Sequence, residues 1–278
     1  MALDRNLVIR TLSGIVMLGV VLGAVLVSPY TMAALFVLLT IGAQWEFYKI
    51  ARQTGAAPLR VYPTIIGALL VGGGFAVVTG MLSLSWLLCL LPLYGVLFIT
   101  ELYRKSSMPL TNVAWALTGI MYIAVPFALL TVLPCTEAPE EGFVYNPLVV
   151  LGVIFTVWAN DIGAYLIGRW LGRHRLFERI SPKKSWEGFF GGVCSAIAVG
   201  ILMGHWQNAS LQLWAGAGLV IAVSSVFGDL VESMLKRSVG LKDSGSIIPG
   251  HGGFLDRFDA LLMAVPFVFV YFMFMLLS

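Results

Sequence analysis

Charge is scarce in this sequence. Only 11% of its 278 residues are Asp, Glu, Lys or Arg, whereas 59% are hydrophobic and the mean hydropathy is +0.92. A typical soluble domain carries about 25% charged residues, so the composition excludes an ordinary soluble protein. The chain is predicted to be an integral membrane protein.

Cysteine is also rare, since the chain has three in all, at positions 89, 135 and 194. They form no C-x-x-C pair, which argues against metal or redox chemistry through sulfur, and we expect them to be buried as small apolar side chains. Internal repeats and long polar stretches are missing as well. The longest segments outside the apolar runs are 169–185 and 233–257, so no soluble domain is predicted.

What the chain has in abundance is apolar runs. A membrane-spanning helix needs about 20 mostly apolar residues, because its backbone must satisfy its own hydrogen bonds across the hydrocarbon. Nine runs qualify. They lie at about 7–27, 31–48, 61–79, 82–100, 110–133, 147–168, 186–204, 209–232 and 258–277. We therefore predict an all-α polytopic membrane protein of about nine transmembrane helices.

The distribution of positive charge predicts the orientation. All 17 Lys and Arg lie near the N-terminus or in the second, fourth, sixth and eighth loops, while Glu137, Glu140 and Glu141 lie in a loop on the opposite side. Short cytoplasmic loops retain Lys and Arg. The N-terminus is therefore expected in the cytoplasm and the C-terminus outside. Topology alone accounts for many of these cations, although a basic face also attracts anionic lipids and soluble phosphates.

Five acids fall inside or at the ends of the apolar runs, where each costs about 2.5–3.5 kcal/mol to insert and needs a reason. They are Glu46, Asp161, Glu187, Asp229 and Glu232. All five lie toward the predicted cytoplasmic ends of their spans. Asp161 could be a packed, hydrogen-bonded acid or a ligand.

The end of the eighth span predicts a strip of oxygen ligands. Asp229, Glu232 and Ser233 occur at i, i+3 and i+4 and so share one helix face, with Lys236 one turn further on. At the start of the ninth span, Asp256 and Asp259 are again i, i+3. Carboxylates suit Mg²⁺ and the nearby cations suit phosphate, which together favour phosphoryl or nucleotidyl transfer. The alternative is a salt-bridged helix hairpin without chemistry.

The loop between these spans is rich in glycine. Gly250, Gly252 and Gly253 could present backbone N–H groups to an anion, because they lead into the N-terminus of the ninth helix. His251 could bind a proton or a phosphate, or could make an ordinary loop hydrogen bond. Turns and helix packing also use glycine, so the pattern alone is weak.

The sixth loop predicts a second anion site. Ser181, Lys183, Lys184 and Ser185 lie together just before the seventh span. Pro182 and the lysine pair are interpreted as a turn into a helix whose hydroxyls and cations face something anionic. Retention of positive charge in the cytoplasm is the alternative explanation.

Residues 233–259 resemble the signature of the phosphatidate cytidylyltransferases, in S-M-L-K-R, then K-D-S-G, then P-G-H-G-G-F-L-D-R-F-D. Residues 160–165 (N-D-x-G-A-Y), 181–188 (S-P-K-K-S-W-E-G) and 227–233 (F-G-D-L-x-E-S) resemble the family's other polar motifs in the same order. The first 140 residues carry little beyond their spans. A single integral membrane domain is expected, with residues 1–140 as N-terminal spans and residues 147–278 as catalytic spans and loops.

The resemblance implies transfer of CMP from CTP to phosphatidic acid, giving CDP-diacylglycerol and pyrophosphate. It also implies Mg²⁺, a second cation such as K⁺ and a membrane-lipid environment. A homodimer is in keeping with the family, and no nucleic-acid partner is expected. The location it suggests is a bacterial cytoplasmic (inner) membrane, with the active site facing the cytoplasm.

We assign roles to the matched residues as a hypothesis. Asp229 and Asp256 hold Mg²⁺ and, with Lys236 and Arg237, form the catalytic set. Substrate phosphates are assigned to Ser181, Lys183, Lys184, Ser185, Lys242, Asp243, Gly250, His251, Gly252, Gly253 and Arg257. Within this set, Asp243 orients the cations. The supporting acids Glu232 and Asp259 do the same. Asp161 is a further supporting residue to which we assign no specific role.

Two other functions share some of these features. A CDP-alcohol phosphotransferase would share the metal and the lipid, but its D-G-x-x-A-R pattern followed by G-x-x-x-D-x-x-x-D does not occur in the sequence. An ion-coupled transporter could use Asp161, Glu187 and Asp229 as a relay. Such a protein favours charges at mid-membrane and repeated halves with broken helices, whereas these charges cluster toward one face.

Overall fold

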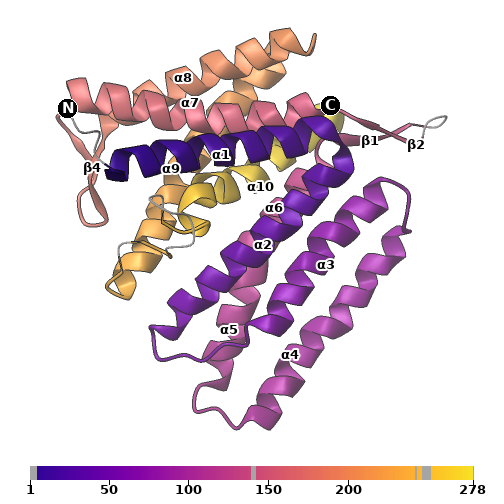
Figure 1. Cartoon of the computed structure of the whole chain (residues 1–278). Helices are drawn as coiled ribbons and strands as arrows, with labels where there is room; N and C mark the ends of the chain where they lie inside the picture. The colour runs from indigo at the N-terminus through magenta and orange to yellow at the C-terminus, as the bar shows by residue number, and fades with distance from the viewer. Residues whose placement is uncertain (1–4, 139–141, 242, 246–251, 278) are drawn as a thin grey trace. The chain divides into compact units, whose positions relative to one another are not determined.

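The computed structural model describes residues 5–138, 142–241, 243–245 and 252–277 (Figure 1). Eight helices in the described chain are long and apolar enough to cross a membrane, which confirms the predicted all-α polytopic membrane fold. They are Pro29–Arg52, Val61–Val78, Leu84–Arg104, Pro109–Val132, Pro147–Leu171, Trp186–Trp206, Leu211–Ser238 and Leu255–Leu276. The first predicted span corresponds to α1 (Arg5–Val27), whose described apolar part, Thr11–Val27, is shorter than the others.

Two helix boundaries differ from the prediction in a way that matters for function. Helix α9 (Leu211–Ser238) does not end at residue 232 but continues to Ser238, so Lys236 and Arg237 lie on its last turn. Helix α10 (Leu255–Leu277) begins three residues earlier than predicted. Polar residues at a membrane surface continue a helix at little cost, and hydropathy therefore underestimates its length. Both predicted acid strips are helical.

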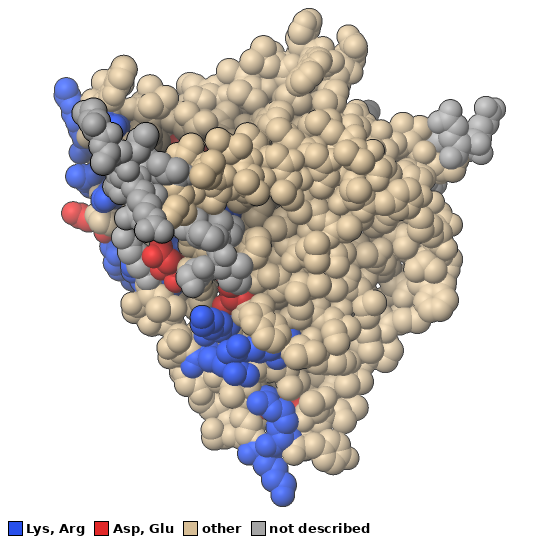
Figure 2. Space-filling model, viewed as in Figure 1, with Lys and Arg blue, Asp and Glu red and all other residues tan. Residues whose placement is uncertain are grey.

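The chain divides into two compact units, which are described separately. Unit 1 comprises Met1–Pro147 and Leu241–Arg257, and unit 2 comprises Leu148–Gly240 and Phe258–Ser278. Figure 2 shows mostly uncharged surface over the helices of each unit, as expected of helices that face lipid. In unit 1, Lys and Arg gather over the ends of α2 and α4.

Unit 1 is a set of antiparallel helices followed by a short β-hairpin. Its helices are α1, α2 (Pro29–Arg52), α3 (Val61–Val78), α4 (Leu90–Arg104, preceded by a 3₁₀ turn at Leu84–Cys89), α5 (Pro109–Gly119) and α6 (Val125–Val132). A π-helical turn, Ile120–Ala124, joins the last two. Ser28 separates α1 from α2, because its hydroxyl accepts the Thr31 N–H (3.1 Å) and Pro29 occupies the first helical position.

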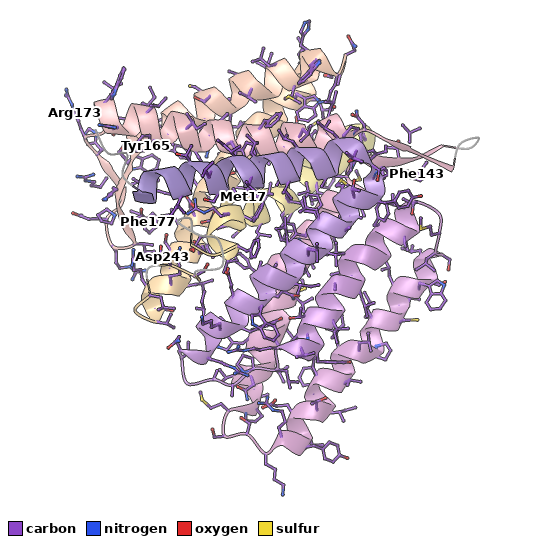
Figure 3. All side chains as sticks on the ribbon, viewed as in Figure 1. Met17, Phe143, Tyr165, Arg173, Phe177 and Asp243 are labelled. Atoms are coloured by element: carbon purple, nitrogen blue, oxygen red, sulfur yellow. The ribbon has the colours of Figure 1, made fainter. Side chains whose placement is uncertain are left out.

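The hairpin of unit 1 was not predicted. Strands β1 (Cys135–Ala138) and β2 (Gly142–Tyr145) pair antiparallel, with Cys135 opposite Tyr145. The Tyr145 hydroxyl donates to the Val25 carbonyl at 2.7 Å, and Phe143 packs against the small cluster of Ala33, Phe75 and Cys135 (Figure 3). The hairpin is thereby fastened to the helices that precede it.

The expected burial of the cysteines is correct for one of them. Cys135 is buried, and this burial raises the pKa of its thiol to about 11. Cys89 and Cys194 are exposed in the structure. Both belong to apolar helices, where an outward-facing small apolar side chain meets lipid rather than water.

Unit 2 consists of α7 (Pro147–Leu171), the hairpin β3 (Arg175–Phe177) and β4 (Ser181–Ser185), α8 (Trp186–Trp206), α9 and most of α10. Its helices approach closely at glycines. A Cβ atom at Gly152 would overlap the Trp214 ring, and one at Gly218 would lie 2.7 Å from the Ala196 carbonyl oxygen on α8. Small residues allow this backbone contact between α8 and α9.

We predict that G218A destabilises the protein by about 1–3 kcal/mol, because the added methyl group meets backbone atoms that cannot rotate away. The measurement is thermal unfolding of the purified protein in detergent. G95A is the matched control, since a Cβ atom at Gly95 on α4 would meet nothing within 4 Å. Equal melting temperatures for the two variants would contradict the close α8–α9 contact.

Candidate functional site

The centre of unit 2 is an ion pair between the hairpin and α9. Lys184 Nζ lies 2.7 Å from Asp229 Oδ2, and the two side chains are 28% and 36% exposed. Successive residues of a strand point to opposite faces, so β4 directs Lys184 inward while Lys183 is exposed. Of the two predicted phosphate-binding lysines, only Lys184 therefore faces the acids of unit 2.

The predicted turn into a helix at residues 181–185 is wrong. These residues form β4, which pairs with β3 and passes directly into α8. Pro182 is tolerated because a two-stranded hairpin has an edge where no N–H is required. Ser185 is buried and its hydroxyl accepts the Gly188 N–H at 3.2 Å, which caps α8. Its predicted contact with phosphate stays a prediction, and Ser181 is half-buried at the start of the strand.

Further acids surround Asp229. The carboxyl group of Asp259 on α10 is within hydrogen-bonding reach of both Asp229 and Glu232. Lys236 Nζ lies 2.7 Å from Glu232 Oε2, one turn along α9. Asp229, Glu232 and Lys236 all lie on helix α9, as predicted, and Asp259 on α10 links the two acids of that helix.

Asp161 extends this cluster from α7. It lies close enough to Asp229 and Lys184 to interact electrostatically with both. The neighbouring Asn160 is buried, and its side-chain amide lies within hydrogen-bonding reach of the Asp161 carboxyl group. This contact helps to orient Asp161 within the cluster.

The acidic side chains of this cluster are oxygen donors, the type of ligand that divalent cations bind. Four acids, Asp161, Asp229, Glu232 and Asp259, lie together, and two lysines pair with them. Carboxylates this close repel one another unless a proton or cation lies between them. The described residues contain no group of three His, Cys, Asp or Glu in a metal-holding arrangement. Mg²⁺ needs only one or two carboxylates, with water and substrate phosphate completing its shell.

Glu187 has a different role from the other acids in the apolar runs. Its carboxylate accepts the backbone N–H groups of Arg173 (3.1 Å) and His174 (3.3 Å) and lies 2.6 Å from His174 Nδ1. Figure 3 labels Arg173 just before β3 and Phe177 at the end of that strand. Glu187 thus fastens the start of the hairpin to the first turn of α8. This contact favours a structural role over the proton relay of the transporter hypothesis.

In unit 1, Asp256 organises the glycine-rich loop. Its carboxylate accepts the Ser244 N–H at 2.9 Å and the Gly253 N–H at 3.0 Å. Gly252 adopts a left-handed backbone with φ of 85°, which favours glycine. The Gly253 N–H, predicted to bind a substrate anion, is therefore engaged by an anion of the protein itself. Metal binding by Asp256 stays a prediction.

Glu46 contacts the glycine-rich loop, a role that the sequence did not suggest. It is buried on α2 and its Oε2 accepts the Leu255 N–H at 3.0 Å and the Ser244 hydroxyl at 3.3 Å. A Cβ atom at Gly253 would lie 2.8 Å from Glu46 Cδ, so only glycine fits there. Glu46 and Asp256 together hold both ends of the loop. An acid in an apolar run was the only available signal.

The remaining predicted site residues are surface groups or lie outside the described residues. Arg237, Asp243 and Arg257 are exposed, and Figure 3 labels Asp243 in the loop. Lys242, Gly250 and His251 lie outside the described residues. Asp229 and Asp256 belong to different units, and each is described within its own unit.

Comparison with known proteins agrees with this chemistry. The profile of the cytidylyltransferase family matches residues 8–275. The chain belongs to the cytidylyltransferase family. It is an enzyme of the nucleotidyltransferase class, as the motifs in residues 160–259 predicted.

Three relatives of this chain come from bacteria. A phosphatidate cytidylyltransferase from Synechocystis sp. is 34% identical over 273 residues, which cover 89% of each chain. A phosphatidate cytidylyltransferase from Staphylococcus epidermidis is 39% identical over 165 residues, covering 58% of this chain and 60% of the relative. The protein of the same name from Staphylococcus aureus is 37% identical over 164 residues, with the same coverage.

We predict that E46A loosens the loop. The substitution removes two hydrogen bonds to the Glu46 carboxylate, so the fraction of molecules in which the loop is detached should rise about tenfold or more. Tryptic cleavage after Lys242 or Arg257 should accelerate by a similar factor, because trypsin cuts the detached loop. The measurement is the cleavage rate of the purified protein, followed by mass spectrometry.

The control is E101A, because Glu101 is an equally buried acid of unit 1 that contacts Arg104 and Asn112 instead of the loop. E46Q keeps an acceptor oxygen and should restore part of the protection. Equal acceleration in E46A and E101A would mean general destabilisation and would refute the specific role of Glu46.

Proposed function

We propose that this enzyme transfers CMP from CTP to phosphatidic acid, giving CDP-diacylglycerol and pyrophosphate in phospholipid synthesis. The observation that carries the proposal is the cluster of acids and lysines on α7, β4, α9 and α10 in a chain of this family. Oxygen ligands and cations in one place are what a nucleotidyl transfer requires. The names of the relatives supply the substrate.

In the proposed reaction, a phosphate oxygen of phosphatidic acid attacks the α-phosphorus of CTP. A new phosphorus–oxygen bond forms, the bond between the α- and β-phosphates breaks, and pyrophosphate leaves. A phosphate monoester is already ionised near neutral pH, so the attacking oxygen needs alignment and charge neutralisation rather than a strong base. A site of carboxylates and lysines suits this requirement.

The proposed metal ligands are Asp229 and Asp256, with Mg²⁺ and a second cation such as K⁺. Bound Mg²⁺ would neutralise phosphate charge on CTP. Lys184 and Lys236 keep Asp229 and Glu232 in place through their ion pairs. Arg237, Lys242, Arg257 and the backbone of residues 250–252 are proposed to bind phosphates, with Ser181 and Lys183 at the hairpin, while the Gly253 N–H serves Asp256.

The proposed location is the cytoplasmic face of a bacterial inner membrane. Phosphatidic acid would remain in the cytoplasmic leaflet with its headgroup at the surface, and CTP would arrive from the cytosol. The distribution of all Lys and Arg supports this orientation. A homodimer is part of the proposal through the family resemblance alone.

The test is pyrophosphate release by the purified protein in detergent, with each component omitted in turn. Release should require CTP, phosphatidic acid and Mg²⁺ together. D229N should lower the rate by at least about a hundredfold, because loss of a metal ligand removes electrostatic stabilisation of the transition state. D256N should lower the rate by a similar factor, since Asp256 is the second proposed ligand. E178Q is the control, since Glu178 is an exposed acid of the β3–β4 hairpin.

A folded wild-type protein that releases no pyrophosphate from CTP and phosphatidic acid would refute the reaction. D229N with full Mg²⁺-dependent turnover would refute the metal assignment and leave the reaction standing. The two parts of the proposal are therefore tested separately.

A further inference from the structure

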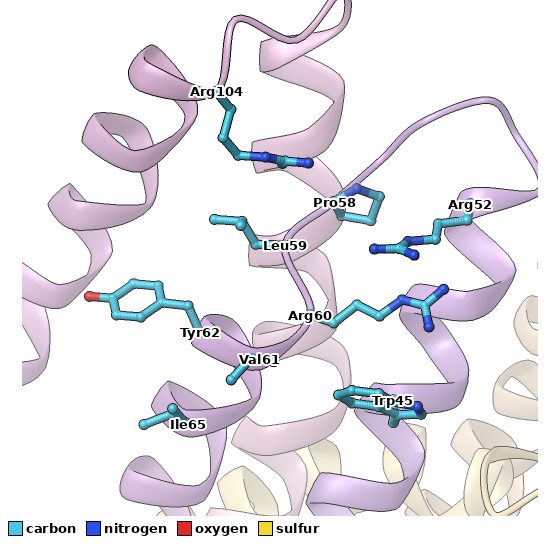
Figure 4. Close-up of a pocket in the computed structure, with 9 residues that line it drawn as sticks. All are labelled: Trp45, Arg52, Pro58, Leu59, Arg60, Val61, Tyr62, Ile65 and Arg104. Atoms are coloured by element: carbon cyan, nitrogen blue, oxygen red, sulfur yellow. The ribbon is translucent and has the colours of Figure 1, made fainter.

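Unit 1 contains a basic pocket that has no part in the proposed reaction. It has a volume of about 470 Å³ and lies where α2 ends, α3 begins and α4 ends. Three arginines line it, Arg52, Arg60 and Arg104 (Figure 4). Its lining also includes Trp45, Val61 and Ile65. Residues from three separate helices thus converge on one cavity.

The pocket carries excess positive charge. Glu101 is the acid that pairs with Arg104, at 2.6 Å, and it also accepts the Asn112 amide at 2.5 Å. Arg52 and Arg60 reach toward one another in Figure 4. Three arginines against this one carboxylate leave an excess of two positive charges at the wall. Guanidinium groups held this close repel one another unless an anion lies between them.

Arg60 is held in place without its full set of hydrogen bonds. Its Nε atom is buried and has no acceptor among the described residues. The guanidinium carbon lies 5.7 Å from the centre of the Trp45 ring, within range of a cation–π contact. Burial and the nearby Arg52 lower the pKa of Arg60. The contact with Trp45 orients the Arg60 guanidinium, a charged hydrogen-bond donor, at the wall of the pocket.

The other wall of the pocket is apolar. Trp45 is 43% exposed, Val61 61% and Ile65 49%, on helices that are long enough to cross a membrane. Tryptophan beside arginine is typical of the membrane surface, where a ring meets lipid and a cation meets headgroups. An occupant with a phosphate next to an apolar portion would satisfy both walls.

We propose that this pocket binds the phosphate of an anionic phospholipid, with Arg52, Arg60 and Arg104 around the headgroup and Val61 and Ile65 beside the acyl chain. Retention of positive charge in the cytoplasm explains why arginines lie in these loops. It does not explain a cavity that collects them, a buried Nε atom without a partner or a guanidinium stacked on Trp45. A free phosphate anion shares the headgroup chemistry, so the experiment separates the two sources.

The experiment measures the melting temperature of the purified full-length protein in neutral detergent. Phosphatidylglycerol, phosphatidylcholine or inorganic phosphate is added in increasing amounts, and the apparent Kd follows from the shift. Phosphatidylglycerol should raise the melting temperature, and phosphatidylcholine should not. In R52Q/R60Q the Kd should weaken about tenfold for each arginine, or about a hundredfold together.

K49Q/K105Q is the matched control, because it removes two exposed cations from α2 and from the end of α4 that do not line the pocket. It should keep the wild-type Kd. If inorganic phosphate raises the melting temperature of the wild type but not of R52Q/R60Q, the anion site is supported and its ligand is a soluble phosphate rather than a lipid. No shift with either ligand, or equal loss in both double variants, would overturn the proposal.

Discussion

A carboxylate on an apolar helix must be neutralised by something close to it, and this constraint shapes unit 2. Inserting such a group costs about 2.5–3.5 kcal/mol on insertion scales. Asp229 meets Lys184 from the hairpin, and Glu232 meets Lys236 one turn along its own helix. The hairpin, α9 and α10 are therefore arranged so that each acid has a cation or another acid within reach. The four acids outnumber their two lysine partners, and a divalent cation would neutralise the remaining negative charge.

Unit 1 solves a similar problem with backbone rather than with lysine. Glu46 and Asp256 receive N–H groups from Leu255, Ser244 and Gly253. Hydrogen bonds to an ionised group are stronger than those between neutral groups. The described parts of the loop that carries the family signature, at Ser244 and at Gly253 to Leu255, are thus held by two carboxylates.

Contacts between residues that are close in the sequence could be predicted, and contacts between distant residues could not. The face of Asp229, Glu232 and Lys236 follows from helical periodicity, because the residues lie within two turns of one another. Lys184 and Asp229 are 45 residues apart, and Glu46 is 198 residues from Ser244, so no local pattern links them. The β3–β4 hairpin escaped prediction because its strands are short, polar and interrupted by Pro182.

The most direct test of this account is a double-mutant cycle on Lys184 and Asp229, measured as the free energy of unfolding in detergent. K184M and D229N preserve much of the side-chain volume and remove one charge each. Since the pair is partly exposed, each single change should cost about 1–3 kcal/mol, and the double variant should be more stable than the sum predicts by about 1–2 kcal/mol. Additive effects would show that the ion pair does not hold the hairpin to α9, and would contradict the account.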